Sequence, residues 1–343
     1  MKALVALLLL TQLLNCKSIP VGPFQPLLSR VIDCDDPESE EAAAIAVDYI
    51  NSHNLHGYKF ALNSIEKIKV LPRRPTGELF LLELDLLQTE CHIVNPLPAE
   101  NCTVRPITDH VVEGECDVKL LKLDGSFSML SRKCHSKPDS AEDIIQICPD
   151  CPLLAVLNDT RVINAVNLAL AQYNGEHEDV YLRLVEIGRA QILHLPDSVS
   201  VEFAVVVTNC SGKDAQEHVD GCLPEDQRFG FCKASVLTEG NITVSCEVYG
   251  HQTLCLKFSI TGVAPLVIAI AGVTHDHLTK EHLGGEIPSL SKGFKHHDLR
   301  HFHRGPAQDT SDSSSQEAPV ATPPAAPVAK LPLCPGRIRH YQV

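Results

Sequence analysis

The chain has 343 residues, with 43 acidic and 29 basic side chains, a formal net charge of −14 and 14 cysteines. This length predicts more than one domain, and a hydrophobic share of 44% excludes a wholly disordered chain. The negative charge, without any basic cluster long enough to follow a phosphate backbone, excludes DNA and RNA as partners and favours cationic ones.

The first residues predict a signal peptide over residues 1–18. Lys2 precedes an apolar run over residues 3–10, and the small and polar residues Cys16, Lys17 and Ser18 follow. A membrane anchor needs about 20 apolar residues, so this run is too short to span. We therefore expect a secreted, extracellular plasma protein without a membrane span, in which the remaining cysteines form disulfides. Four sequons suit that route, and the predicted N-glycosylation sites are Asn101, Asn158, Asn209 and Asn241.

An internal repeat with a period of about 120 residues organises the chain. The cysteines of the first copy are Cys91, Cys102, Cys116 and Cys134, and they recur as Cys210, Cys222, Cys232 and Cys246. Apolar residues at helical spacing predict a helix over 40–53 in the first copy and over 159–174 in the second. Strand-like runs follow at 58–71 and 78–90, and at 180–193 and 199–209. Each copy is therefore expected to be an α+β unit in which an antiparallel sheet wraps one helix, with domains at 19–143 and 144–256.

The composition changes after the second copy. Residues 257–343 are rich first in histidine and then in Pro, Ala and Ser, which predicts a largely disordered tail. The apolar run 260–273 is too short to cross a bilayer, and a core strand, a reactive-thiol region and an unreliable stretch of sequence all remain open for it.

Particular strings connect these repeats to a known family. The strings are Cys34-Asp35-Asp36-Pro37-Glu38, Leu120-Leu121-Lys122-Leu123-Asp124-Gly125, Cys151-Pro152-Leu153-Leu154 and Cys334-Pro335-Gly336-Arg337-Ile338-Arg339-His340. The chain resembles the fetuin family of the cystatin superfamily, which implies two tandem cystatin-like domains and a tail ending in a disulfide-tethered segment. The implied disulfides are Cys34–Cys334, Cys91–Cys102, Cys116–Cys134, Cys148–Cys151, Cys210–Cys222 and Cys232–Cys246. The resemblance leaves Cys255 unpaired.

Motifs for catalysis and for cystatin-type inhibition are missing. Cystatins use a Gln-x-Val-x-Gly hairpin, but the corresponding turns here lie at 71–77 and 193–197 and do not match it. The sequence has no Gly-x-Ser-x-Gly, His-Glu-x-x-His or P-loop motif. Cys148 and Cys151 have redox spacing, although a structural disulfide is the favoured interpretation in a secreted chain. We expect a protein that is not an enzyme and requires no cofactor.

Alternation along two predicted strands gives the most informative pattern. Glu83 and Asp85 share one face, about 7 Å apart, and Glu113, Glu115 and Asp117 share one face of a later strand. If the strands are neighbours, about 4.8 Å apart, the five carboxylates form a flat lattice. No EF-hand loop is present, so a lattice suits the Ca²⁺ ions of a mineral surface or cluster better than a single ion. A solvated acidic face is the alternative. The two repeats carry equal formal charge, but the second has Ala204, Phe229 and Phe231 at corresponding places, so the carboxylates are concentrated in the first.

Two further features bear on ligands. Ser140 and Ser315 lie in Ser-x-Glu patterns, which predicts phosphorylation and, with it, stronger attraction for Ca²⁺. His275, His277, His296 and His297 are weak candidates for loose chelation of Zn²⁺ or Cu²⁺, against a pH-sensitive spacer.

The leading hypothesis is a protein that binds calcium phosphate clusters and inhibits ectopic mineralisation, which is also the activity that the family resemblance implies. The first alternative is an inhibitor of metalloproteinases, which the resemblance implies through relatives with two cystatin-like domains. The second is a modulator of insulin receptor signalling, and no residue supports or excludes it.

Overall fold

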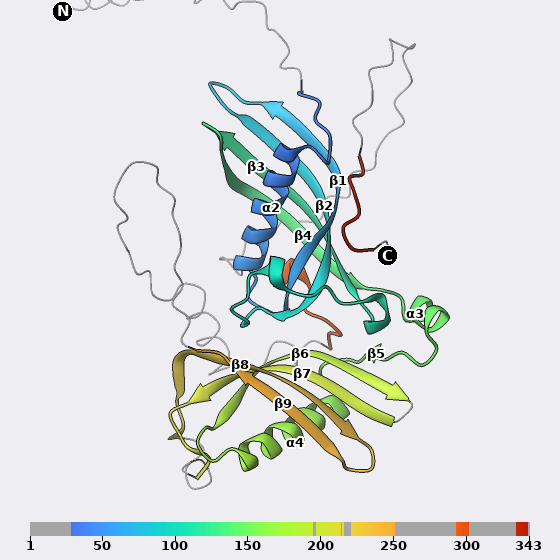
Figure 1. Ribbon diagram of the computed structural model, residues 1–343, viewed down its shortest axis with the longest axis vertical. Coiled ribbons are helices and arrows are strands. Elements are labelled where there is room, and N and C mark those ends of the chain that lie inside the picture. Colours follow the sequence, from blue (N-terminus) through green and yellow to red (C-terminus); the bar gives the residue numbers. More distant parts are fainter. Residues whose placement is uncertain are drawn as a thin grey trace, which may run out of the picture.

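The computed structural model describes residues 29–194, 197–213, 215, 221–250, 293–301 and 334–341. The predicted signal peptide, the run at 260–273, Cys255, His275, His277 and Ser315 lie outside the described residues. The expected α+β architecture of two cystatin-like domains is confirmed, as Figure 1 shows. No helix of the described part of the chain is long and apolar enough to cross a membrane.

The first unit consists of one helix and a four-stranded sheet. Helix α2 (Pro37–Ser52) begins at Asp36, whose carboxylate accepts a hydrogen bond from Glu38 N at 2.9 Å. Ala42, Ala43, Ala46, Val47 and Ile50 form the buried stripe of the helix. The sheet has the order β1-β2-β3-β4 with antiparallel neighbours, and its strands are β1 (Tyr58–Pro72), β2 (Glu78–His92), β3 (Val112–Leu123) and β4 (Ser126–Pro138).

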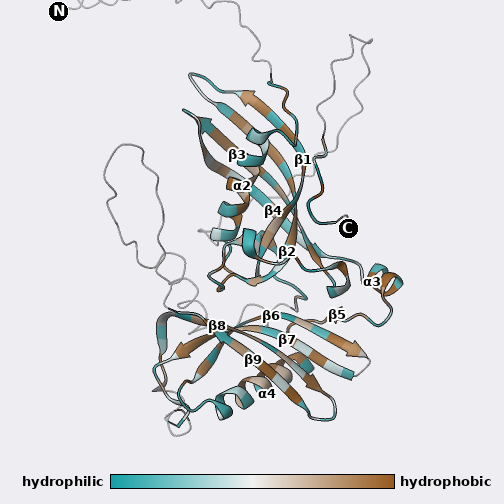
Figure 2. Ribbon diagram, in the orientation of Figure 1, coloured by the Kyte–Doolittle hydropathy of each residue, from teal (hydrophilic) through white to brown (hydrophobic). Residues whose placement is uncertain are grey.

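The second unit repeats this design with one extra short strand. Helix α4 (Thr160–Glu176) begins at the cap Asp159 and buries Val162, Ala165, Val166 and Ala169. Its sheet has the order β5-β6-β7-β8-β9, formed by β5 (Leu153–Leu154), β6 (Leu182–His194), β7 (Asp197–Thr208), β8 (Pro224–Leu237) and β9 (Ile242–Val248). Hydrophobic and hydrophilic residues alternate along many of these strands in Figure 2, as expected for sheets with one face against a helix.

The connection between the units contains a short helix at the expected boundary. The short helix α3 (Ala141–Ile147) spans the position between residues 143 and 144 that was expected to separate the domains. Two short 3-10 turns, at Ala99–Asn101 and Ile107–Asp109, lie between β2 and β3 at the end of the first unit that faces the second.

The outer face of the second sheet packs against the first unit. In Figure 1 this sheet lies between α4 and the first unit. Its apolar side chains Ala204, Val206, Phe229 and Phe231 are buried in one cluster with Tyr58 and Val94 of the first unit. The two units are therefore docked through a partly apolar interface.

Two segments from the end of the chain join this assembly. Residues 293–301, named the bridging segment here, contain a short turn at Leu299–His301 and lie between the units, an exception to the expected disordered tail. Residues 334–341, the C-terminal segment, are attached to the first unit by the disulfide Cys34–Cys334 and by the hydrogen bond from Gly336 N to Ile65 O.

Candidate functional site

The five predicted carboxylates lie on two neighbouring strands of the first sheet. Strands β2 and β3 pair antiparallel, with Glu83 opposite Asp117, Asp85 opposite Glu115, and Glu113 opposite Leu87. Directly opposite residues share a face of the sheet. The carboxylates Glu83, Asp85, Glu113, Glu115 and Asp117 form the acidic face, while Phe80, Leu82, Leu84 and Leu86 point into the core.

The acidic face is divided into an open part and a covered part. Glu83, Glu115 and Asp117 are exposed. The side chain of Glu113 is only 17% exposed, and Asp85 is half-buried. The expectation that all five carboxylates face solvent is therefore corrected for Asp85 and Glu113.

The C-terminal segment covers this second part. Asn63 Nδ2 donates to Asp85 Oδ2 at 2.8 Å and also to the carbonyl oxygen of Tyr341 at 2.9 Å. Burial raises the pKa of Asp85 to about 6, and the neighbouring carboxylates of Glu113 and Glu66 add to the rise. Asp85 therefore takes up a proton at a pH closer to neutrality than an ordinary aspartate does.

Basic side chains flank the acidic face on both outer strands. On β1, Lys67 Nζ lies 2.9 Å from Glu83 Oε1. On β4, Lys137 Nζ lies 3.3 Å from Glu115 Oε1, and Lys133 is opposite Asp117 in the register. His135 Nε2 lies 3.1 Å from Glu115 Oε2. The two carboxylate rows thus have one lysine beside them on β1 and two lysines and a histidine on β4, an arrangement that can contact cations and anions of one ionic solid.

Sequence analysis missed one carboxylate, that of Glu66. The register between β1 and β2 shifts between Ile65 and Lys67, so Glu66 is an extra residue at an irregularity and strict alternation does not place it. It is exposed and, with Glu83, Asp85, Glu115 and Asp117, lines an open hollow of about 240 Å³ that also includes Lys133 and His135.

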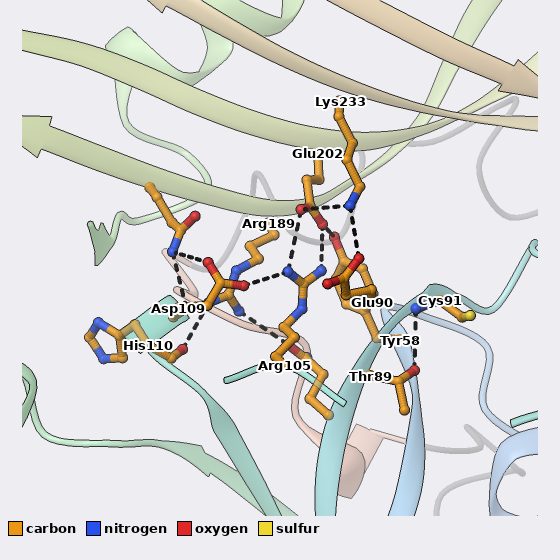
Figure 3. Close-up of polar contacts among 12 residues, drawn as sticks. Tyr58, Thr89, Glu90, Cys91, Arg105, Asp109, His110, Arg189, Glu202 and Lys233 are labelled. Atoms are coloured by element: carbon orange, nitrogen blue, oxygen red, sulfur yellow. Dashed lines mark hydrogen bonds and ion pairs between the residues drawn. The ribbon is translucent and has the colours of Figure 1, made fainter. Parts of the chain in front are cut away.

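The contrast between the repeats has a packing cause. Ala204, Phe229 and Phe231 stand where the first unit has carboxylates, and all three are buried against the first unit. Glu202 is only 13% exposed, and its carboxylate contacts Arg105 and Tyr58 (Figure 3). The second sheet is apolar on this face because it docks, so the contrast alone is weaker evidence for a mineral-binding lattice than the sequence suggested.

The predicted glycosylation sites and the predicted phosphorylation site Ser140 lie at the surface. The sequon residues Asn101, Asn158, Asn209 and Asn241 are all exposed. Ser140 is exposed and caps α3, where its hydroxyl accepts a hydrogen bond from Asp143 N at 3.1 Å. A phosphate on Ser140 would lie at a helix start, although α3 has only seven residues.

The part of the chain that the structure describes contains six disulfides, which join the pairs that the family resemblance implies: Cys34–Cys334, Cys91–Cys102, Cys116–Cys134, Cys148–Cys151, Cys210–Cys222 and Cys232–Cys246. The disulfide Cys148–Cys151 closes a small loop directly after α3, and Pro149 and Asp150 within it are exposed. The turn that corresponds to the inhibitory hairpin of cystatins lies between β1 and β2 and contains residues 73–77.

The two described histidine candidates are structural. His296 Nε2 lies 3.0 Å from Ser136 O, and His297 Nε2 lies 2.9 Å from Ile187 O. Both belong to the bridging segment between the units, so the spacer interpretation is wrong for them. No group of three or more His, Cys, Asp or Glu side chains in the described ranges is arranged to hold a metal ion.

Comparisons with known proteins extend over the whole chain. Residues 152–241 match the model of the cystatin domain. The chain is 43% identical over 363 residues to alpha-2-HS-glycoprotein of Bos taurus, with all of both chains covered. The crystal structure of mouse fetuin-B superposes with a TM-score of 0.56 and 25% identity, over 66% of this chain and 72% of that one. Mouse fetuin-B in its inhibitory complex with human meprin beta also superposes with a TM-score of 0.56, at 24% identity over 66% of this chain and 76% of that one.

Proposed function

We propose that this chain, which belongs to the alpha-2-HS-glycoprotein (fetuin) family, is a secreted glycoprotein that binds calcium phosphate clusters through its first unit and inhibits ectopic mineralisation. The activity is binding rather than catalysis. The observation that supports this proposal best is the pairing of two carboxylate rows on β2 and β3, with lysines beside them on β1 and β4.

The chemistry of this face suits an ionic solid. Carboxylate oxygens are preferred Ca²⁺ ligands, and a flat face with an open hollow offers ions at a surface several contacts at once. The lysine ammonium groups, as compact charges, can contact phosphate. Lys67 and Lys137 already neutralise part of the acidic face. Attraction of free Ca²⁺ by net charge alone is therefore a poor description of how this face would bind.

The test replaces the three exposed carboxylates. The variant Glu83→Gln, Glu115→Gln, Asp117→Asn removes three charges from side chains at the surface, and each change should alter the free energy of unfolding by no more than about 0.5 kcal/mol. If the lost contacts together contribute about 1.4 kcal/mol, about ten-fold more protein is needed to inhibit calcium phosphate precipitation.

The matched control is Glu176→Gln, Glu178→Gln, Asp179→Asn. These residues are exposed in the second unit, and the control changes the net charge by the same amount. Equal losses in both variants would support a polyanion effect, and unchanged inhibition in both would leave the acidic face as a solvated surface.

Inhibition of metalloproteinases is a second candidate function. Mouse fetuin-B forms an inhibitory complex with human meprin beta. In this chain the loop closed by Cys148–Cys151 leaves Asp150 exposed, and zinc accepts carboxylate ligands. A meprin beta activity assay with the parent and Asp150→Ala tests this candidate, whereas the same substitution should leave calcium phosphate inhibition unchanged.

A further inference from the structure

The bridging segment makes specific contacts with both units. On the first unit, Ser136 N donates to Asp298 Oδ1 at 3.0 Å, and Leu299 N donates to Ser136 Oγ at 3.1 Å. On the second unit, Leu157 N donates to Phe294 O at 2.7 Å, and His297 Nε2 lies 2.9 Å from Ile187 O. Six residues, 294–299, therefore connect the last part of β4 to β6 and to the chain before α4.

The first unit provides room for this segment at two glycines. Leu299 is 2% exposed and packs in the core of the first unit. A Cβ atom at Gly114 would lie 3.0 Å from Leu299 Cδ1, and a Cβ atom at Gly57 would lie 2.8 Å from His297 Cβ. Larger side chains at these positions would displace the segment, so the surface is shaped to receive it.

One buried carboxylate joins the three parts. Glu186 of the second unit is 1% exposed, and Gly57 N of the first unit donates to its Oε1 at 2.6 Å. His56 Nδ1 lies 2.8 Å from Oε2, while His92 Nε2 and His297 Nε2 lie 3.1 and 3.3 Å from Oε1. Three imidazoles, one of them on the bridging segment, thus surround a single negative charge.

From these contacts we propose that the seam between the units is a binding site for a short peptide, that the chain's own residues 293–301 are its ligand, and that acidification releases this ligand. The segment has few apolar side chains, and its backbone and histidine contacts supply most of its specificity. A peptide with the same sequence should therefore bind in trans when the site is empty.

Charge balance gives the reason for release by acid. The buried carboxylate of Glu186 offsets one positive charge, and His297, which is only 10% exposed, shares its contact with His56 and His92, so a proton on His297 has at most part of that charge to offset it. Arg105 and Arg189 of the neighbouring network are cationic. Arg105 contacts the carboxylates of Asp109 and Glu202, and Arg189 donates to the backbone carbonyl oxygens of Asp109 and His110. These groups do not supply a second free carboxylate to the seam.

Both histidines of the bridging segment have a lowered pKa, which also favours release by acid. Burial lowers the pKa of His297, and the Glu186 carboxylate opposes this only in part. Burial also lowers the pKa of His296, which faces Ser136 O, Asp298 and the cations Arg300 and Arg189. A histidine with a lower pKa in the bound state is protonated preferentially in the free state, so binding weakens as the pH falls below about 6.5.

A labelled peptide of the sequence 293–301 is the probe. The full-chain variant Leu299→Asp empties the site, because a carboxylate cannot replace the buried leucine. Fluorescence anisotropy at pH 7.4 should show the peptide binding to this variant at least about ten-fold more tightly than to the parent, whose site is occupied in cis. Between pH 7.4 and 5.5 the dissociation constant should rise at least about ten-fold. Equal binding to the two chains, or no change with pH, would overturn the proposal.

Hydrogen exchange on the parent chain provides a test without a destabilising variant. The amides of Leu157, Ser136 and Leu299 donate to or from the bridging segment and should lose protection at pH 5.5, after correction for intrinsic exchange rates, while amides in the middle of β2 keep theirs. His297→Gln should make this response shallower, and His177→Gln, on an exposed histidine of the second unit, should not. Unchanged protection in the parent would exclude acid release.

Discussion

Arg105 of the first unit donates a hydrogen bond to Glu202 of the second, with Nη2 and Oε2 2.6 Å apart. The Arg105 side chain is 2% exposed, and Tyr58 OH also donates to Glu202, at 2.6 Å (Figure 3). Burial alone would raise the pKa of Glu202, but the charge and hydrogen bonds of Arg105 outweigh it and hold the pKa below its ordinary value. A buried ion pair therefore fixes how the units dock.

Removing Glu202 should destabilise the docked protein. Glu202→Ala leaves the Arg105 guanidinium buried with Asp109 as its remaining carboxylate partner, and breaking such a pair costs about 3 kcal/mol. Urea unfolding monitored by circular dichroism should show this loss of unfolding free energy. The exposed substitution Glu178→Ala serves as the control and should stay within about 0.5 kcal/mol. Equal stability of the two variants would contradict the role given to the pair.

The lysines beside the acidic face allow a test in which attraction by net charge and direct contact with phosphate predict opposite results. Lys67→Gln, Lys133→Gln, Lys137→Gln makes the protein more negative by three charges, which would improve binding if net charge attracted Ca²⁺. If the lysines contact phosphate, inhibition of calcium phosphate precipitation should instead fall, by about ten-fold for a loss of about 1.4 kcal/mol.

The control for the lysine variant is Arg161→Gln, Lys213→Gln, Arg228→Gln in the second unit. This change gives an equal net charge away from the acidic face and should leave inhibition as it is in the parent. Improved inhibition by the lysine variant would show that the cations only screen the carboxylates.

Asp85 should give the acidic face a pH dependence near neutrality. Because its pKa is raised to about 6, the carboxyl group is ionised at pH 7.4 and largely protonated at pH 5.5. Calorimetric binding of Ca²⁺ should weaken over that interval in the parent. Asp85→Asn should bind more weakly at pH 7.4 and change less with pH.

The same group affects stability with a defined sign. The folded pKa lies above the unfolded value of about 3.9, so ionisation of Asp85 lowers the free energy of unfolding as the pH rises through 6. Asp85→Asn removes this contribution, and its unfolding free energy should fall less than that of the parent between pH 5 and 7.5. A steeper fall would contradict the raised pKa.

The bond between Cys34 and Cys334 should keep a cleaved chain in one piece. Proteolysis anywhere in 302–333 leaves the C-terminal segment attached to the first unit by this disulfide and by contacts such as that between Arg339 and Glu40. Gels of nicked protein should show one band without reductant and two with it. Two bands in both conditions would exclude the bridge.

The helices and most strands could be predicted because their signals are local. The apolar spacing of α4 and the alternation of Phe80, Leu82 and Leu84 each predict one face against the core, and the structure has both. The family resemblance supplied the cysteine pairs. Alternation did not predict Glu66 beside the acidic face, because this residue lies at a register irregularity.

The docking of the units could not be predicted, because its residues have no local pattern. Glu186 and Glu202 alternate with apolar neighbours as surface carboxylates do, and contacts with the first unit leave the side chain of Glu186 1% exposed and that of Glu202 13% exposed. His296 and His297 lie in a stretch with few apolar residues, so composition predicted a spacer. Their contacts depend on positions more than a hundred residues away.

The disulfide Cys34–Cys334 joins residues 300 positions apart, and it determines how the protein would respond to mechanical tension. A force applied between residue 30 and residue 341 passes through the covalent bond, since both ends are fastened to the same unit. The second unit lies inside the closed loop and would carry none of that load. Pulled at residues 30 and 341 in an oxidising medium, the protein should lengthen only by the few residues between those points and the bond, and full extension should require a reductant.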